Sequence, residues 1–393
     1  MSPSGYQVAI GYGALDSANG SESNMIAIGT NALGNMDNNS SSQNTAIGVG
    51  AMDGVGGIVA TNNIMIGLNA GGGTWTGSTS DGNVGMGNAV MDAAMDGATF
   101  NTAVGNNALS SLTSGIRNTA IGSATCHSLT TGERNIAIGS DALYYGSTET
   151  DDNIAIGNNA MAGNFGTNAV NDCIAIGSDA LDAVLTSTAS GSVAIGKSAL
   201  SALTSGLGNI AIGRDSMKVH TSGYRNTCIG EYTMDDNDAG SYSLSSEDNV
   251  FIGWGCASGT FADTKVENNV AIGSYCMGGA LDGAINNVII GFNSAGALTS
   301  GDNNVSVGSD SISALTSGSG NTSLGANSND TISTTDNNIA VGYNAHKGNG
   351  SANTVVGAYA LDNTSSEADQ TVVIGYAAMR GDTTDGADGT VAI

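Results

Sequence analysis

A short alternation of apolar and small residues recurs along the whole chain, in the phrase N-[V/I/T]-A-[I/V]-G-x-x-[A/S/C]-[L/M]. Its glycine occurs twenty-one times, mostly 17 to 20 residues apart, and Thr390–Ile393 begins a further copy that ends before its glycine. This spacing leaves no room for a conventional globular domain between copies, and a fixed short period is typical of solenoids. The pattern therefore predicts one repetitive β-solenoid domain over residues 1–393, with about one coil per 17–20 residues.

The residues directly before the glycine predict a short β-strand. With the glycine as position 0, position −3 is Val, Ile or Thr and position −1 is aliphatic or Met in every copy, whereas position −2 is Ala in thirteen of twenty-two. This period-2 alternation and the β-branched residues are typical of strands. Positions −3 and −1 share one face of such a strand, which we interpret as the interior of the coil, so that position −2 faces outward.

An outward Ala column predicts lateral association. A solvated strand face would carry polar side chains, and a monomer with a long apolar stripe on its surface is rare among soluble proteins. Small residues in this column indicate that another backbone packs closely against it. The assembly-interface candidates are Ala27, Ala46, Ala120, Ala137, Ala155, Ala175, Ala194 and Ala211.

The other repeat positions predict how each coil closes. Asn occupies position −4 in sixteen copies, where stacked side chains can form an amide ladder and help the chain turn into the strand. The glycine tolerates a positive φ at a tight corner. We expect the Leu or Met side chain at position +4 to point into the core. Parallel coils lie about 4.8 Å apart, so twenty-one coils predict a rod of roughly 100 Å.

Composition and charge exclude several classes of binding partner. The formal net charge is −26, with 9 Lys plus Arg against 35 Asp plus Glu. Such a surface repels nucleic acid and anionic membranes. Gly, Asn or Asp interrupts every apolar run before it reaches membrane-spanning length. Residues 1–5 lead straight into the first repeat, without a recognisable signal peptide.

The phrase N-x-[V/I]-A-I-G-x-x-[A/S] resembles the head repeat of YadA-like trimeric autotransporter adhesins. The longer phrase N-T-A-I-G-x-x-A-L-x-x-L-T-S-G, near residues 101–115 and 118–132, is similar to repeats of bacteriophage tail fibres and tailspikes. The resemblance implies a left-handed parallel β-roll packed side by side as a homotrimer. Since the sequence shows no signal peptide, coiled-coil stalk or membrane barrel of an autotransporter, it favours a virion appendage.

Three functions fit these observations. The first is a non-enzymatic trimeric tail-fibre shaft that displays loops to a cell-surface glycan or protein. The second is a self-assembling extracellular filament or adhesin head segment, and the third is a polysaccharide-degrading tailspike. The expected location is the virion or the cell exterior. Because neither end of the sequence shows a cap, we also expect end-to-end contact with further fibre protein.

The longest interval between repeat glycines, from Gly230 to Gly253, combines aromatic rings with carboxylates. Rings stack on the apolar faces of sugars and acids accept hydroxyl protons, so the interval predicts a recognition surface; the alternative is a bulge that fills an irregular core. The recognition candidates are Tyr232, Asp235, Asp236, Asp238, Tyr242 and Trp254.

Metal and catalytic motifs are weak throughout the sequence. The loops 235–238 and 382–388 carry oxygen ligands that suit Ca²⁺, but no calcium-binding nonapeptide repeats, so we interpret them as solvated turns and expect no cofactor or metal. His127, His220 and His346 share no spacing. No Ser, His or carboxylate pattern singles out a catalytic group, so we expect no enzymatic activity.

The five cysteines lack a CxxC pair and predict buried free thiols. Cys256 and Cys276 both occupy position +3 in consecutive copies. We therefore expect them to lie side by side as thiols, because parallel stacked side chains have poor torsion for a disulfide.

Overall fold

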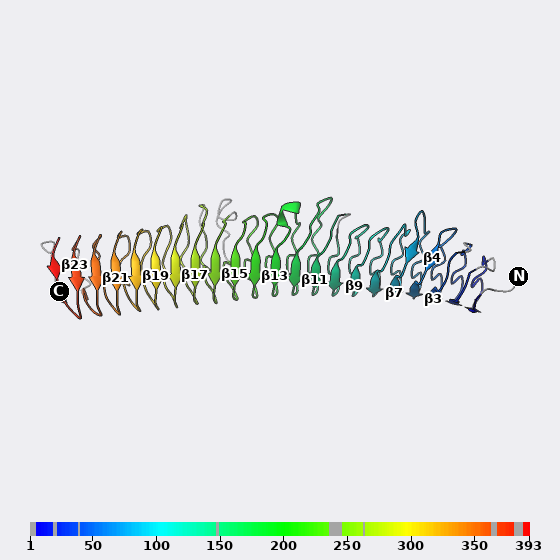
Figure 1. Ribbon diagram of the computed structural model, residues 1–393, viewed down its shortest axis with the longest axis horizontal. Coiled ribbons are helices and arrows are strands. Elements are labelled where there is room, and N and C mark those ends of the chain that lie inside the picture. The colour runs from blue at the N-terminus through cyan, green and yellow to red at the C-terminus, as the bar shows by residue number, and fades with distance from the viewer. Residues whose placement is uncertain are drawn as a thin grey trace. The chain divides into compact units, whose positions relative to one another are not determined.

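The computed structural model describes residues 5–18, 22–37, 40–146, 149–235, 246–261, 264–362, 368–380 and 388–393. It divides into two compact units, an N-terminal unit over residues 1–197 and a C-terminal unit over residues 198–393. In both units one short strand per repeat pairs in parallel with the strand of the next repeat (Figure 1). The predicted all-β parallel β-solenoid is confirmed. Trimeric packing and the single-domain extent stay predictions.

The N-terminal unit contains thirteen strands and one 3₁₀ turn among its described residues. They are β1 Gln7–Ile10, β2 Met25–Ile28, β3 Thr45–Ile47, β4 Ala60–Thr61, β5 Ile64–Ile66, β6 Ser80–Asp81, β7 Val84–Met86, β8 Thr102–Val104, β9 Thr119–Ile121, β10 Ile136–Ile138, β11 Ile154–Ile156, β12 Ile174–Ile176, η1 Ser187–Ala189 and β13 Val193–Ile195. The short β4 and β6 pair with each other, and the repeat strands stack in register, with Ala137 between Ala120 and Ala155.

The C-terminal unit continues the same pattern with one strand per repeat. Its strands are β14 Ile210–Ile212, β15 Thr227–Ile229, β16 Val250–Ile252, β17 Val270–Ile272, β18 Val288–Ile290, β19 Val305–Val307, β20 Thr322–Leu324, β21 Ile339–Val341, β22 Thr354–Val356, β23 Val372–Ile374 and β24 Val391–Ala392. The register pairs the equivalent strand positions of successive repeats, so each strand position becomes a column of stacked side chains.

The predicted Asn ladder is present in both units. Asn118 accepts at Oδ1 from the backbone N–H and from Nδ2 of Asn135, at 3.0 Å each, and its own Nδ2 donates to the Gly132 carbonyl at 2.7 Å. The same bonds link Asn44 to Asn63 and Asn226 to Asn249. These side chains are fully buried. Each amide thus satisfies the backbone of the next coil inside the core, which explains the recurrence of Asn at position −4.

The repeat glycine is required by the close approach of successive coils. At Gly157, φ is +136°, and a β-carbon added there would lie 2.5 Å from the carbonyl oxygen of Gly177 in the next coil. The other repeat glycines have φ between +129° and +148°. Both the backbone conformation and the missing space exclude a side chain at this corner.

The predicted orientation of the strand faces is wrong. The Ala column at position −2 points into the coil, and the described alanines that we named as interface candidates are all fully buried within the single chain: Ala27, Ala46, Ala120, Ala137, Ala155, Ala175, Ala194 and Ala211. The larger residues of this column, such as Met65, Phe251 and Ile289, are also fully buried. These alanines therefore belong to the core and do not meet neighbouring chains.

The narrowness of the coil explains this orientation. A β-carbon added at Gly85, a position −2 residue, would lie 2.6 Å from Met65 Sδ and 3.1 Å from Val90 Cγ1. Val90 occupies position +3 on the returning part of the coil, so the two walls of the coil nearly touch at this level. Ala fits that space in most coils, and the predicted inward Leu or Met at position +4, such as Leu109 and Leu143, fills the rest of the core.

The bulky aliphatic residues at positions −3 and −1 consequently face outward. Ile121 and Ile136 are each 40% exposed, and Leu324 in the C-terminal unit is 39% exposed. These two columns contain Val, Ile, Leu, Met or Thr in all twenty-two copies, without a charged residue. Each unit therefore carries a flat apolar face, which we call the outer sheet face and define by positions −3 and −1 of its strands.

Candidate recognition surfaces

The structure brings two of the predicted recognition residues together. Tyr232 and Trp254 lie in successive coils with their rings edge to face, 6.2 Å between centroids and 89° between planes. Asp235 is half-buried at the end of the same turn as Tyr232. The remaining candidates, Asp236, Asp238 and Tyr242, lie outside the described residues. Among the described residues, the predicted recognition surface thus contains a pair of contacting rings at the corner after the repeat glycine.

This pair belongs to a longer aromatic column that the sequence analysis missed. Trp254 packs against Tyr275 at 4.6 Å and 81°, and Tyr275 against Phe292 at 6.2 Å and 88°. Trp254, Tyr275 and Phe292 are 43%, 44% and 55% exposed. We call Tyr232, Trp254, Tyr275 and Phe292 the aromatic column. Its sequence signal was an aromatic residue at position +1 or +2 in four consecutive copies.

A second set of rings repeats the arrangement near the end of the C-terminal unit. Tyr343 contacts Tyr359 at 5.4 Å, and Tyr359 contacts Tyr376 at 6.2 Å, again nearly perpendicular. The Arg380 guanidinium lies over the Tyr359 ring, as Arg214 lies over Tyr232 in the first column. Edge-to-face contacts and an overlying cation hold these partly exposed rings in place between successive coils.

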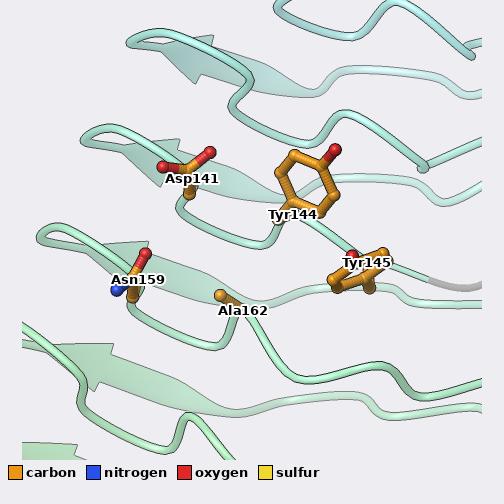
Figure 2. A pocket seen from close by; sticks show the side chains of 5 residues that line it. All are labelled: Asp141, Tyr144, Tyr145, Asn159 and Ala162. Atoms are coloured by element: carbon orange, nitrogen blue, oxygen red, sulfur yellow. The ribbon is translucent and has the colours of Figure 1, made fainter.

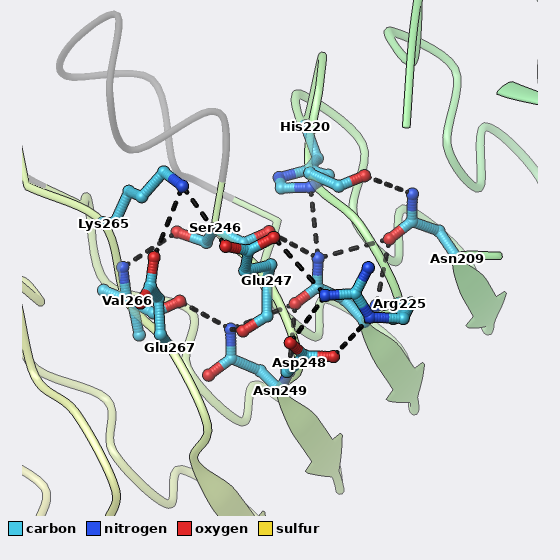
Figure 3. Close-up of polar contacts among 12 residues, drawn as sticks. Asn209, His220, Arg225, Ser246, Glu247, Asp248, Asn249, Lys265, Val266 and Glu267 are labelled. Atoms are coloured by element: carbon cyan, nitrogen blue, oxygen red, sulfur yellow. Dashed lines mark hydrogen bonds and ion pairs between the residues drawn. The ribbon is translucent and has the colours of Figure 1, made fainter. Parts of the chain in front are cut away.

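Ion pairs surround residues 246–249, which lie directly before β16 (Figure 3). Arg225 Nε lies 2.6 Å from Asp248 Oδ1, and this hydrogen bond lowers the pKa of Asp248 below its ordinary value. Lys265 Nζ lies 3.3 Å from Glu247 and 3.4 Å from Glu267. Because these partly exposed carboxylates already pair with cations, they fix the chain locally and contribute little to overall stability.

His220 lies beside this network but inside the core. It occupies position +7, which Leu203 fills in the preceding coil, and its Nε2 is 3.5 Å from Asn226 Nδ2. Burial lowers the pKa of His220 to about 4, and the pKa of the buried His346 likewise to about 4. Both imidazoles are therefore neutral at pH 7, so their charging in acid opposes folding.

The C-terminal unit is expected to lose stability as pH falls from about 6.5 to 4. The unfolded histidine takes up its proton near pH 6.5, whereas the buried one does so only near pH 4, so acid favours the unfolded state by about 3 kcal/mol per histidine. His220→Leu, which restores the residue of the preceding coil, should remove roughly half of this dependence. The urea midpoints of the wild type and of His220→Leu, measured at pH 7 and at pH 4.5, test this expectation. An equal shift of the midpoint with pH in the two proteins would contradict it.

The N-terminal unit contains a corner pocket of about 230 Å³ lined by Asp141, Tyr144, Tyr145, Asn159 and Ala162. Figure 2 shows the two rings on one side, Asp141 and Asn159 on the other, and Ala162 between them in the next coil. The pocket follows from the register, because Ala162 occupies the same repeat position as Tyr144 and is much smaller. Sequence analysis did not single out these residues.

The side chains that line this corner pocket are held by their neighbours. The Tyr144 ring stacks on His127 with 4.8 Å between centroids and contacts Tyr145 nearly edge to face. Asp141 and Asn159 both occupy position +2 with φ of 58° and 55°, a left-handed conformation that Asp and Asn tolerate well. Ser140 Oγ donates to Asp141 Oδ2 at 2.9 Å, and Asn159 Nδ2 donates to Asp179 Oδ1 at 3.1 Å.

The cysteines behave as expected. All five are buried free thiols, and Cys256 and Cys276 lie in adjacent coils, where their contact and burial raise the pKa of Cys256 well above its ordinary value. Burial also raises the pKa of the Cys126 thiol to about 12. The prediction of neighbouring thiols is confirmed, and their burial makes them poor nucleophiles.

Within the described ranges, no group of three or more His, Cys, Asp or Glu side chains is arranged to hold a metal ion. Most residues of the two proposed calcium loops fall outside those ranges, so calcium binding stays untested. In the second loop, Asp388 Oδ1 accepts from the Asp369 backbone N–H at 2.8 Å. None of the described helical segments is long and apolar enough to cross a membrane.

No protein-family model and no curated protein sequence matches the chain. The likeness to YadA-like and tail-fibre repeats thus rests on the repeated phrase alone.

Proposed function

We propose that this protein is a non-enzymatic structural element of a fibre in which several copies associate laterally through the outer sheet face. The observation that carries this proposal is the composition of that face: two columns of Val, Ile, Leu, Met and Thr side chains, many of them about 40% exposed or more, with no charged residue in any copy. A contiguous apolar surface of this kind marks an interaction site in soluble proteins.

The distribution of charge supports the same conclusion. None of the 35 acidic residues occupies position −3 or −1, the two positions that define the outer sheet face. Like charge on the corners keeps copies apart in every orientation except the one that brings their uncharged faces together. A homotrimer, as the resemblance implies, would bury this face around a common axis while leaving the charged corners in water.

The aromatic column supports a recognition role for the fibre. Exposed rings beside polar corner residues offer contact area for a cell-surface glycan or protein, at low cost in side-chain entropy. A virion tail appendage is the setting that we favour, and an extracellular filament or adhesin head segment is the alternative. Neighbouring genes separate these settings: virion genes support the appendage, and secretion genes support the filament.

Val104→Lys combined with Ile121→Lys is expected to dissociate the assembly, because it forces charges into the interface between outer sheet faces. Analytical ultracentrifugation should give a multiple of the 38.7 kDa chain mass for the wild type and a single-chain mass for the variant. The matched control, Asn106→Lys with Ser123→Lys, adds the same charge to the same two coils at exposed corner positions and should remain associated. A wild type that sediments as one chain would refute the proposal.

A further inference from the structure

We propose that the corner pocket of the N-terminal unit binds an ammonium cation that carries small alkyl groups. The pocket combines two tyrosine rings, a carboxylate and a methyl group in about 230 Å³ (Figure 2). Tyr145 is 45% exposed and meets Tyr144 at 71°, so the two rings form a corner rather than a flat platform. Such a corner offers ring surface to a rounded group from two directions.

Charge favours a cation at this place. Residues 135–196, which include all five residues that line the corner pocket, contain seven acidic residues and no Lys or Arg. The nearest preceding cation in the sequence, Arg134, pairs with Glu133 and with Asp152 Oδ1. Among the described residues, the side chain that hydrogen-bonds Asp141 is the neutral Ser140 hydroxyl. A positively charged ligand would therefore supply the counter-charge that the chain itself does not bring to Asp141.

The remaining lining specifies the substituents of the cation. A cation near an aromatic face is attracted by the ring quadrupole, and methylated ammonium groups also bury apolar surface against rings. The Ala162 methyl group forms part of the same wall and offers no hydrogen bond, so a bare ammonium ion would lose hydration there without replacement. Besides the two tyrosine hydroxyls, a neutral sugar would find only Asp141 and Asn159 as polar side chains, few partners for its several hydroxyl groups.

This site lies at the corner of the coil and uses none of the outer sheet face, so the inference does not depend on lateral association. The alkylated ammonium group that the pocket would bind occurs in free choline, in phosphocholine head groups and in trimethylated lysine. The phosphate of a phosphocholine head group is repelled by the acidic surroundings, whereas choline and trimethyllysine present the same cation without it. Comparing the three compounds thus identifies the source.

Saturation-transfer NMR on the whole 393-residue chain, with choline, phosphocholine and Nε-trimethyllysine as probes, tests the proposal. At least one probe should bind saturably, with a dissociation constant on the order of 1 mM for so small a ligand. Asp141→Asn and Tyr145→Ala should each weaken binding about tenfold, and Ala162→Leu should abolish it by filling the pocket. Binding should also weaken as salt is raised.

Asp310→Asn is the matched control. It removes the same charge at the same repeat position in the C-terminal unit, where Asp310 accepts from Asn293 Nδ2, and it should leave probe binding unchanged. Saturable binding of phosphocholine without choline or trimethyllysine would contradict the charge argument and overturn the proposal, because the added phosphate should weaken binding in these acidic surroundings. Absence of binding by all three probes, or binding that persists in Ala162→Leu, would overturn the proposal. Sedimentation of the same samples tests the fibre proposal separately.

Discussion

Ala137→Lys is expected to unfold much of the N-terminal unit, whereas Ile138→Lys, the adjacent substitution, should leave it folded. Ala137 is fully buried between Ala120 and Ala155, so lysine there places a charge in a dry core and costs about 3–5 kcal/mol. Because each coil is stabilised by its neighbours, the loss spreads to the coils on both sides. Ile138 is 37% exposed and faces outward, so its lysine reaches solvent.

Circular dichroism with urea denaturation of both variants checks this expectation. The two substitutions introduce the same residue at neighbouring positions of one strand, so each serves as the control for the other. Unfolding by Ile138→Lys together with tolerance of Ala137→Lys would show that the strand presents its faces the opposite way, with the alanines outside.

Gly157→Ala is expected to destabilise the same unit by about 3 kcal/mol or more. An L-residue rarely adopts φ of +136°, and the added β-carbon would lie 2.5 Å from the Gly177 carbonyl oxygen, so either the backbone or the coil spacing must shift. Neither can shift without disturbing the parallel pairing of β11 with β12. The midpoint and slope of chemical unfolding, followed by circular dichroism, measure the loss.

Gly57→Ala is the matched control for this substitution. Among the described residues, a β-carbon there would meet only Asp37 Oδ1, at 3.5 Å, which is an ordinary van der Waals contact, and φ lies outside the left-handed region. Its effect should stay within about 0.5 kcal/mol, as for most surface substitutions. Similar losses from both alanines would show that the close approach of the repeat glycines does not limit the fold.

The repeat period was enough to predict the parallel solenoid, because each column of the sequence maps onto one column of stacked side chains. Asn at position −4 could be recognised as a ladder for the same reason: identical amides in register donate and accept from one coil to the next, as Asn118 and Asn135 do. The glycine corner and the inward residues at position +4, such as Leu109, also followed from the residue types alone. These features depend on contacts between equivalent positions, which the period specifies directly.

Features that depend on contacts between different repeat positions emerged only from the tertiary structure. Alternation along a strand separates two faces but does not say which one is inside, and both faces here are apolar. The distance across the coil decides which face is inside. The wall that carries Val90 leaves room for Ala at position −2 of the facing strand, but seldom for a branched side chain. The corner pocket likewise exists only because Ala162 stacks below Tyr144, a size difference between coils that no property of a single repeat predicts.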